Sequence, residues 1–307
     1  MLKRRLISAA IIISIMVVLL WADHYLGRPE VLGKPGLLLA GVTTLTAVLA
    51  AGELVRMWRA AGVQGLSYVV SLGGSLLLCA GAFLPIYWPA SLQLWPIGVF
   101  GGTLFGLFAA IVAAAAHEMW WFDQPGSEVE RLSRQVFSFA YLAMLVGMVV
   151  PHRLMIGLGP EEDRNGSGIC AVLAVMVAVK LSDTFAYMFG KLWGRRKLAP
   201  LLSPNKTIEG AAGSFVGAIV GAALVFYLVA WFVADDSFFK PFWWVVVYGI
   251  VVAAAGMLGD LAESLVKRDA KCKDSSGWLA GLGGVLDIID SLIFAAPASY
   301  LVWLILP

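Results

Sequence analysis

The sequence predicts an all-α, polytopic integral membrane protein with about nine transmembrane helices. The 307-residue chain is 60% hydrophobic and only 14% charged, and its mean hydropathy is +0.86. A water-soluble chain of this length needs more charged side chains to cover its surface. Apolar runs of spanning length recur along the whole sequence, and no stretch is typical of a separate soluble domain.

Nine apolar segments have the length that a membrane-spanning helix requires. The first follows Lys3, Arg4 and Arg5, as in a secretory signal, but no small-residue cleavage site comes after it, so we expect a retained helix. The segments cover residues 6–21, 36–52, 68–88, 94–116, 136–157, 169–190, 211–234, 242–259 and 289–306. We expect residues 1–120 to form an N-terminal transmembrane scaffold. Residues 121–307 are the candidate catalytic region, with polar loops at 191–210 and 260–288.

The basic residues predict how the chain is oriented in the membrane. Of the 22 Lys and Arg residues, 16 precede the first segment or follow the second, fourth, sixth and eighth segments, and five lie toward the opposite side. Cytoplasmic loops carry the excess of Lys and Arg. We therefore expect a cytoplasmic N-terminus, an outside C-terminus, and both long polar loops on the cytoplasmic face of the inner membrane.

Two rows of glycines repeat at every fourth residue within predicted spans. One row is Gly98, Gly102 and Gly106, and the other is Gly213, Gly217 and Gly221. This spacing lets two helix backbones approach closely in lipid. We interpret both rows as packing surfaces.

An acidic residue, Asp183, lies near the end of the sixth segment, between Ser182 and Thr184. A carboxylate within a span is costly unless it pairs with a charge or coordinates a cation. An ion pair with Lys180 or Lys191 is one interpretation. A polar cavity open to the cytoplasm is the interpretation that we favour.

The stretch from Ser203 to Gly210 leads directly into the seventh segment. Pro204 breaks the preceding structure, so Lys206 and Thr207 are predicted near a helix N-terminus, where backbone N–H groups and the helix dipole favour an anion. A phosphate site is one interpretation. A helix cap with a cytoplasmic lysine is the other.

The most polar stretch of the chain follows the eighth segment. Asp260 and Glu263 are three residues apart, and so are Asp287 and Asp290 at the start of the ninth segment, a spacing that places each pair on one helix face. Paired carboxylates are suited to Mg²⁺, which prefers oxygen ligands. Between the pairs, the glycines Gly281, Gly283 and Gly284 would let the backbone approach a phosphate closely. The basic residues Lys267, Arg268 and Lys273 would bind that phosphate. A solvated loop is the alternative interpretation.

These motifs, in their order along a polytopic chain, resemble the signature of the phosphatidate cytidylyltransferases, the CDP-diacylglycerol synthases. The resemblance covers about residues 180–300. It is carried by Asp183-x-x-Ala186-Tyr187, Lys197-Leu198-Ala199-Pro200, Ser203-Pro204-x-Lys206-Thr207-x-Glu209-Gly210, Gly259-Asp260-Leu261-x-Glu263-Ser264-x-x-Lys267-Arg268, Lys273-Asp274-x-Ser276-x-x-Leu279, Gly281-x-Gly283-Gly284 and Asp287-x-x-Asp290.

The resemblance implies transfer of a cytidylyl group from CTP to phosphatidate, giving CDP-diacylglycerol and pyrophosphate. It implies Mg²⁺ as cofactor, with room for a second cation, a membrane-lipid substrate, a homodimer as a candidate assembly, and no nucleic-acid partner. The implied catalytic residues are Asp260, Asp287, Asp290 and Lys273, of which the three carboxylates are also the implied metal ligands. The implied substrate-binding residues are Asp183, Ser203, Lys206, Thr207, Glu209, Ser264, Lys267, Arg268, Asp274, Ser275, Ser276, Gly283 and Gly284.

The chain departs from the family pattern at two positions. Leu282 stands where the family has His, and Ile288 stands where it has Arg. Each change removes a phosphate-facing donor, while both carboxylates of the Asp287 and Asp290 pair remain. We favour a catalyst. The alternatives are a CTP-dependent transferase or kinase for another lipid or polyprenyl phosphate, a transporter, and a non-catalytic homologue.

Overall fold

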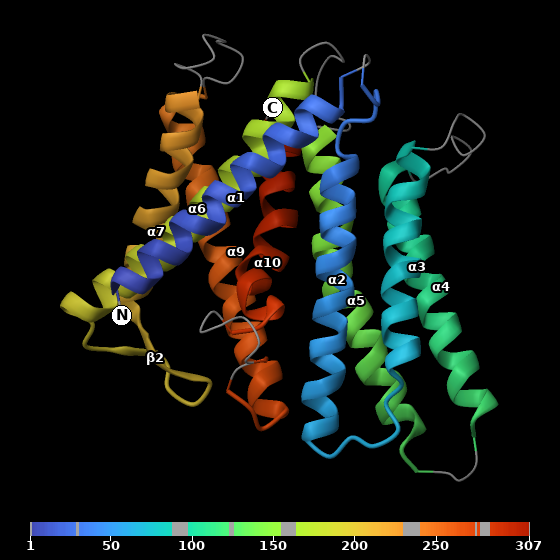
Figure 1. Ribbon diagram of the computed structural model, residues 1–307. Coiled ribbons are helices and arrows are strands. Elements are labelled where there is room, and N and C mark those ends of the chain that lie inside the picture. Colours follow the sequence, from blue (N-terminus) through green and yellow to red (C-terminus); the bar gives the residue numbers. More distant parts are fainter. Residues whose placement is uncertain are drawn as a thin grey trace. The chain divides into compact units, whose positions relative to one another are not determined.

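A computed structural model describes residues 2–28, 31–87, 98–122, 126–154, 164–229, 240–273, 275–276 and 283–306 (Figure 1). The chain is mostly helical. Its helices are α1 (Leu2–Leu26), α2 (Leu37–Ala60), α3 (Tyr68–Tyr87), α4 (Gly98–Trp120), α5 (Glu128–Leu154), α6 (Arg164–Trp193), α7 (Ile208–Ala223), α9 (Phe242–Asp269) and α10 (Val285–Ile305), and a π-helical turn, η3 (Leu224–Val229), continues α7.

The helices bear out a polytopic membrane protein. Among the described residues, seven helices are long and apolar enough to cross a bilayer, namely α2, α4, α5, α6, α7 with η3, α9 and α10. The apolar parts of the other two are shorter, at Ala10–Leu26 and Tyr68–Leu84. The chain is therefore an integral membrane protein.

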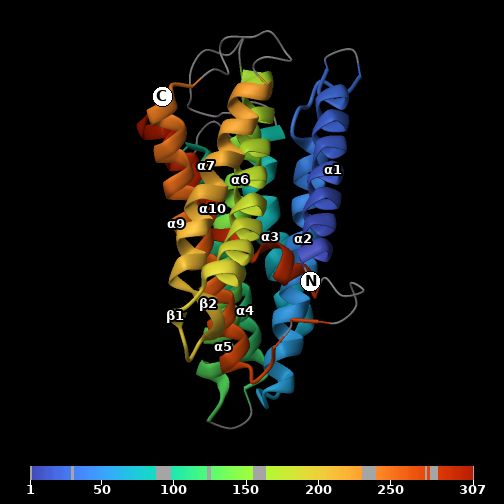
Figure 2. The ribbon, with the colours of Figure 1, turned by 90° about the vertical axis from the view of Figure 1, so that its left-hand side faces the viewer.

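The all-α prediction is wrong in one detail, because two short strands connect α6 to α7. β1 (Lys197–Ala199) and β2 (Ser203–Thr207) pair antiparallel, with Lys197 opposite Thr207 and Ala199 opposite Ser203. Figure 2 shows this hairpin at the end of α6 and α7. An isolated two-stranded ribbon is marginal in water, so the packed helices at both of its ends are what hold it.

The chain divides into two compact units that are interleaved along the sequence. The α6–α7 unit comprises residues 1–38, 152–265 and 290–307, and the α2–α5 unit comprises residues 39–151 and 266–289. This division describes packing and not function, so the predicted scaffold, residues 1–120, and catalytic region, residues 121–307, stay a prediction.

The α6–α7 unit is built on close packing of α7 against α6, with α1 also in contact with α6 (Figure 1). A Cβ at Gly217 would lie 2.5 Å from the Leu181 carbonyl oxygen, and one at Gly221 would lie 2.8 Å from the Ala178 Cα. Only glycine permits this approach, so the packing role predicted for this glycine row is confirmed.

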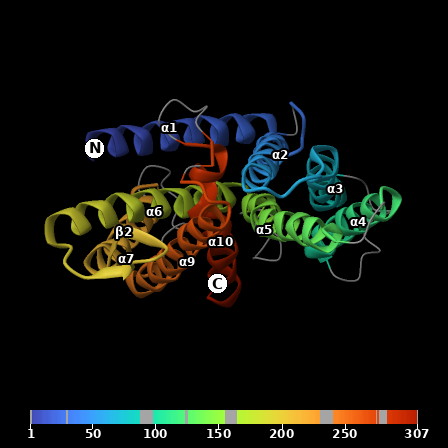
Figure 3. The ribbon, with the colours of Figure 1, turned by 90° about the horizontal axis from the view of Figure 1, so that it is seen from below.

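The α2–α5 unit contains a second pair of closely packed helices, α3 and α4, and Figure 3 shows them from below with α2 and α5. A Cβ at Gly106 on α4 would lie 2.8 Å from the Leu77 carbonyl oxygen on α3. The predicted packing role is thus confirmed at Gly106 of this row. Ala110, Ala114 and Phe139 form a fully buried core beside this contact.

A buried ion pair fixes the end of α1 in the α6–α7 unit. Arg153 is fully buried and its Nε lies 2.9 Å from Asp23 Oδ2, while Asp23 is 1% exposed. Asp23 also accepts hydrogen bonds from the backbone N–H groups of Gly36, at 2.9 Å, and Leu38, at 3.1 Å. The carboxylate therefore satisfies both a buried guanidinium and the first turn of α2.

We expect Arg153→Met to lower the free energy of unfolding by about 3–5 kcal/mol, because it leaves the Asp23 carboxylate buried without its countercharge. Thermal unfolding of the protein in detergent measures the loss. The double variant Asp23→Asn/Arg153→Met should lose less than the single variant. Equal stability of wild type and Arg153→Met would contradict this role.

Candidate functional site

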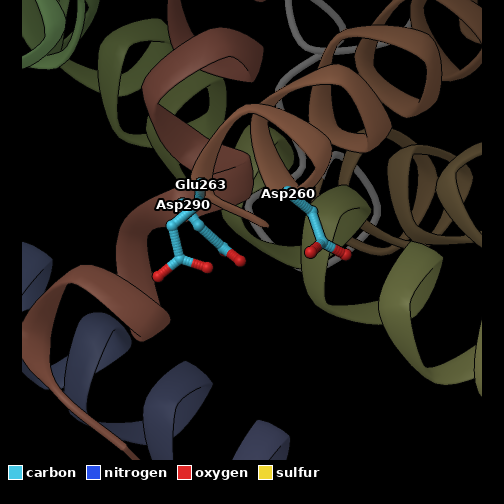
Figure 4. Close-up of side chains that lie close together, drawn as sticks. All are labelled: Asp260, Glu263 and Asp290. Carbon is cyan, nitrogen blue, oxygen red and sulfur yellow. The ribbon is translucent and has the colours of Figure 1, made fainter. Parts of the chain in front are cut away.

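Three carboxylates gather in the α6–α7 unit. Asp260 and Glu263 come from α9 and Asp290 from α10, and one oxygen of each lies within 4.8 Å of the other two (Figure 4). Glu263 is buried, whereas Asp260 and Asp290 are half-buried. We call this set the acidic group.

Local geometry explains why these three side chains meet. The spacing of three residues places Asp260 and Glu263 on one face of α9. Gly259 then allows α10 to approach, because a Cβ at this position would lie 2.5 Å from the Asp290 carbonyl oxygen. The close contact of the two backbones brings the Asp290 carboxylate to the other two.

The acidic group has the chemistry of a divalent-cation site. Three carboxylates this close repel one another unless a cation or protons compensate their charge. Carboxylate oxygens are the ligands that Mg²⁺ prefers, and a few of them leave coordination positions for water and phosphate. The residues present therefore fit Mg²⁺.

A lysine from the hairpin reaches the acidic group. Lys206 on β2 has its Nζ 2.7 Å from Asp260 Oδ2, and the pair is partly open to solvent. On α6, Asp183 lies 4.0 Å from the Lys180 Nζ. The ion pair considered for Asp183 from sequence is thus present. Lys206 places a positive charge directly beside the carboxylates.

Two other polar residues, Thr207 and Glu209 at the junction of β2 and α7, form local hydrogen bonds. Thr207 is the N-cap of α7, and its hydroxyl accepts a hydrogen bond from the Gly210 N–H at 3.1 Å. Glu209 accepts from the Arg195 N–H at 3.0 Å and the Arg196 N–H at 3.2 Å. The helix cap considered from sequence is therefore what Thr207 forms, and phosphate binding by these residues stays a prediction.

A second polar cluster lies in the α2–α5 unit around Asp287. Its carboxylate accepts hydrogen bonds from the Ser275 N–H at 3.2 Å, the Ser275 hydroxyl at 2.7 Å and the Gly284 N–H at 2.6 Å. The ammonium of Lys267 forms an ion pair with it. Gly283 has φ +84°, which favours glycine, and a Cβ there would lie 2.5 Å from the Asp287 carboxylate.

The comparison with known families identifies the chain. The model of the cytidylyltransferase family matches residues 3–306, which is nearly the whole sequence. This chain belongs to the cytidylyltransferase family.

Three curated relatives of this cytidylyltransferase-family chain are each named phosphatidate cytidylyltransferase. The protein from Chlamydia trachomatis is 37% identical over 145 residues, which cover 47% of each chain. Those from Staphylococcus saprophyticus and Staphylococcus epidermidis are 37% and 39% identical over 169 residues, 54% of this chain and 60% of theirs. The chain thus spans about half to three fifths of the length of the relatives that it matches.

The remaining predicted site residues of this family member differ in their exposure. Arg268 and Lys273 are exposed, and Arg268 donates a hydrogen bond to the Cys272 carbonyl at 3.4 Å. Ser203 and Ser264 are half-buried. Asp274, Gly281 and Leu282 lie outside the described residues. The roles of these side chains in binding stay predictions.

Two acidic residues in the clusters were not among the site residues that the resemblance implied. Glu263 lies in the acidic group, and its spacing from Asp260 was the available signal. Glu53 on α2 lies beside Ser275 and Ser276, and the only signal was a carboxylate directly after an apolar run. Neither signal states which distant residues would join the cluster.

Proposed function

We propose that this chain transfers a cytidylyl group from CTP to phosphatidate, which yields CDP-diacylglycerol and pyrophosphate. The observation that carries the proposal is the acidic group with Lys206 beside it, in a membrane protein of the cytidylyltransferase family. The relatives named phosphatidate cytidylyltransferase supply the substrates of the proposal. A lipid phosphate and a nucleotide are both anions, which the Lys206 ammonium and a cation held by the acidic group would bind.

In the proposed reaction, an oxygen of the phosphatidate phosphate attacks the α-phosphorus of CTP. The bond from that phosphorus to the bridging oxygen of the β-phosphate breaks, and pyrophosphate leaves with both electrons of the bond. A bound Mg²⁺ would neutralise charge on the phosphate oxygens. Phosphoryl chemistry of this kind depends mainly on positioning and charge neutralisation, and the phosphatidate anion requires no general base.

The residues of the chain divide this work. We propose that Asp260, Glu263 and Asp290 hold the cation and that Lys206 exchanges its contact with Asp260 for a phosphate oxygen of CTP. We further propose that Asp287, which lies in the cluster with Ser275 and Lys267 and not in the acidic group, has the catalytic role that the family resemblance implies for it. The basic residues predicted from sequence, Lys267, Arg268 and Lys273, would supply further positive charge.

The membrane orientation is part of the proposal. Nine spans, with the N-terminus in the cytoplasm and the C-terminus outside, would place the hairpin and the start of α10 on the cytoplasmic side of the inner membrane, where CTP is present. The excess of Lys and Arg in the corresponding loops supports this orientation.

The position of a radioactive label tests the type of transfer. We expect the purified protein with phosphatidate and Mg²⁺ to move label into lipid from CTP labelled at the α-phosphate, and not from CTP labelled at the γ-phosphate. A chelator in excess of Mg²⁺ should abolish the transfer, and added Mg²⁺ should restore it. Transfer of the γ-label instead would show a CTP-dependent kinase and overturn the proposal.

A further inference from the structure

The buried carboxylate of Glu53 connects α2 to the start of α10. Glu53 is 2% exposed. A buried carboxylate is costly unless hydrogen bonds compensate it, and four donor groups lie within hydrogen-bond distance of it, one of which, the Ser275 hydroxyl, has a single proton that it shares with Asp287. They are the hydroxyls of Ser275, at 3.0 Å, and Ser276, at 2.8 Å, and the backbone N–H groups of Val285 and Leu286, both at 2.9 Å. More than 220 residues separate Glu53 from these donors in the sequence.

Two carboxylates together occupy the N-terminus of α10. Glu53 accepts from the first two N–H groups of the helix, at Val285 and Leu286, and Asp287 accepts from the Gly284 N–H directly before them. Negative charge at this end of a helix is favourable because the unpaired N–H groups and the dipole point toward it. The first turn of α10 is thus anchored from α2.

The same contacts determine where Asp287 lies. The Ser275 hydroxyl is within hydrogen-bond distance of both carboxylates, Glu53 and Asp287, and links them. A Cβ at Gly284 would overlap the Glu53 carboxylate and the Ser275 hydroxyl, so glycine is required for this arrangement. Asp287 in turn meets the ammonium of Lys267. Removing the Glu53 charge therefore releases the groups that orient Asp287.

We propose that Glu53 is a positioning residue of the site: by anchoring Ser275, Ser276 and the first turn of α10, it holds Asp287 and its partner Lys267 in the geometry for the reaction. The inference rests on the proposed cytidylyl transfer for its kinetic consequence. It assigns a role to α2, which lies in the part of the chain predicted from sequence to be scaffold.

Glu53→Gln tests the proposal, because glutamine keeps the shape but loses the charge and one acceptor oxygen. We expect kcat for cytidylyl transfer to fall about 100-fold, the loss typical of a misplacement of about 1 Å. Hydrogen–deuterium exchange resolved to single amides gives a second readout. The amides of Ser275 and Gly284, which bond to Asp287 and not to Glu53, should exchange at least about tenfold faster, while α4 and α5 keep their protection.

Glu118→Gln is the matched control. Glu118 is another buried glutamate of the α2–α5 unit, paired with Arg131 at 2.9 Å, and it does not contact α10 in the described structure. This variant should keep the wild-type kcat and the protection of Ser275 and Gly284. If Glu53→Gln fails to fold, Ser276→Ala, which removes one donor to Glu53, replaces it in the test. We then expect a smaller fall in kcat and a smaller rise in amide exchange at Ser275 and Gly284.

The outcomes separate this inference from the proposed function. Unchanged kcat together with faster exchange only at Val285 and Leu286 would show that Glu53 anchors the helix alone and would overturn the positioning role. Unchanged exchange at Gly284 in a folded variant would overturn it as well. An inactive wild type whose Ser275 and Gly284 amides still depend on Glu53 would contradict the proposed function and leave the placement of Asp287 supported.

Discussion

Asp290→Asn should lower the rate of cytidylyl transfer about 10³-fold while the protein stays folded. The substitution preserves size but removes one of the three charges of the acidic group, and loss of a single charge-stabilising group at a reacting phosphate or acyl centre costs up to this much. Initial rates with CTP, phosphatidate and Mg²⁺ measure the effect.

Asp290→Asn should lower the rate without lowering the stability of the fold, which separates a loss of catalysis from unfolding. Removing one of three neighbouring negative charges relieves repulsion, and the melting temperature without added cation should therefore stay equal or rise. Asp269→Asn, the same change at a half-exposed carboxylate at the end of α9, should leave the rate near that of wild type. Normal activity of Asp290→Asn would contradict the assignment of Asp290 to the cation.

Lys206→Met should lower kcat/KM for CTP about 100-fold. The ammonium of Lys206 is a positive charge beside the acidic group, 2.7 Å from Asp260, and a charge-assisted contact with a phosphate is among the strong hydrogen bonds. Lys206→Arg keeps the charge with a different geometry and should retain an intermediate activity. Steady-state kinetics at varied CTP concentration measure the three proteins.

The hairpin itself offers the control for this prediction. Lys197 is exposed on β1, opposite Thr207, and Lys197→Met should keep kcat/KM within about a factor of three, since a solvated lysine contributes little to a specific contact. Equal losses in Lys197→Met and Lys206→Met would show that only the general positive charge of the hairpin matters, and would contradict the specific role of Lys206.

Hydropathy predicted the location of the helices well but not their ends. The eighth apolar segment was expected to end at residue 259, whereas α9 continues to Asp269. Asp260 ends the apolar run, and the additional turns carry Lys267 and Arg268, whose positive charges suit the negative end of a helix dipole. Charged residues in a sequence indicate where an apolar segment ends, but a helix can continue through them, as α9 does.

The spacing of residues along the sequence predicted only part of the acidic group. The spacing of Asp260 and Glu263 predicted one helix face, and this is what α9 shows. The arrival of Asp290 depends on the close approach of α10 at Gly259. Helix periodicity does not specify which helices touch, so the full group required the structure.

No pattern of neighbouring residues in the sequence predicts the contacts of Glu53. Its partners follow it by more than 220 positions, and its burial is explained only by their hydrogen bonds. The sequence predicted that Gly283 and Gly284 let the backbone approach a phosphate closely, and this stays a prediction. In the structure, the anions that approach are the carboxylates of Asp287 and Glu53.

The measurement that tests cytidylyl transfer most directly is the product balance of the purified full chain in detergent. With CTP, phosphatidate and Mg²⁺, mass spectrometry of the lipid extract quantifies CDP-diacylglycerol, and an enzyme-coupled assay quantifies pyrophosphate. The proposed reaction predicts equal molar amounts of both products, and neither product when a chelator replaces Mg²⁺. Absence of CDP-diacylglycerol from folded protein, or pyrophosphate released without it, would contradict the proposed function.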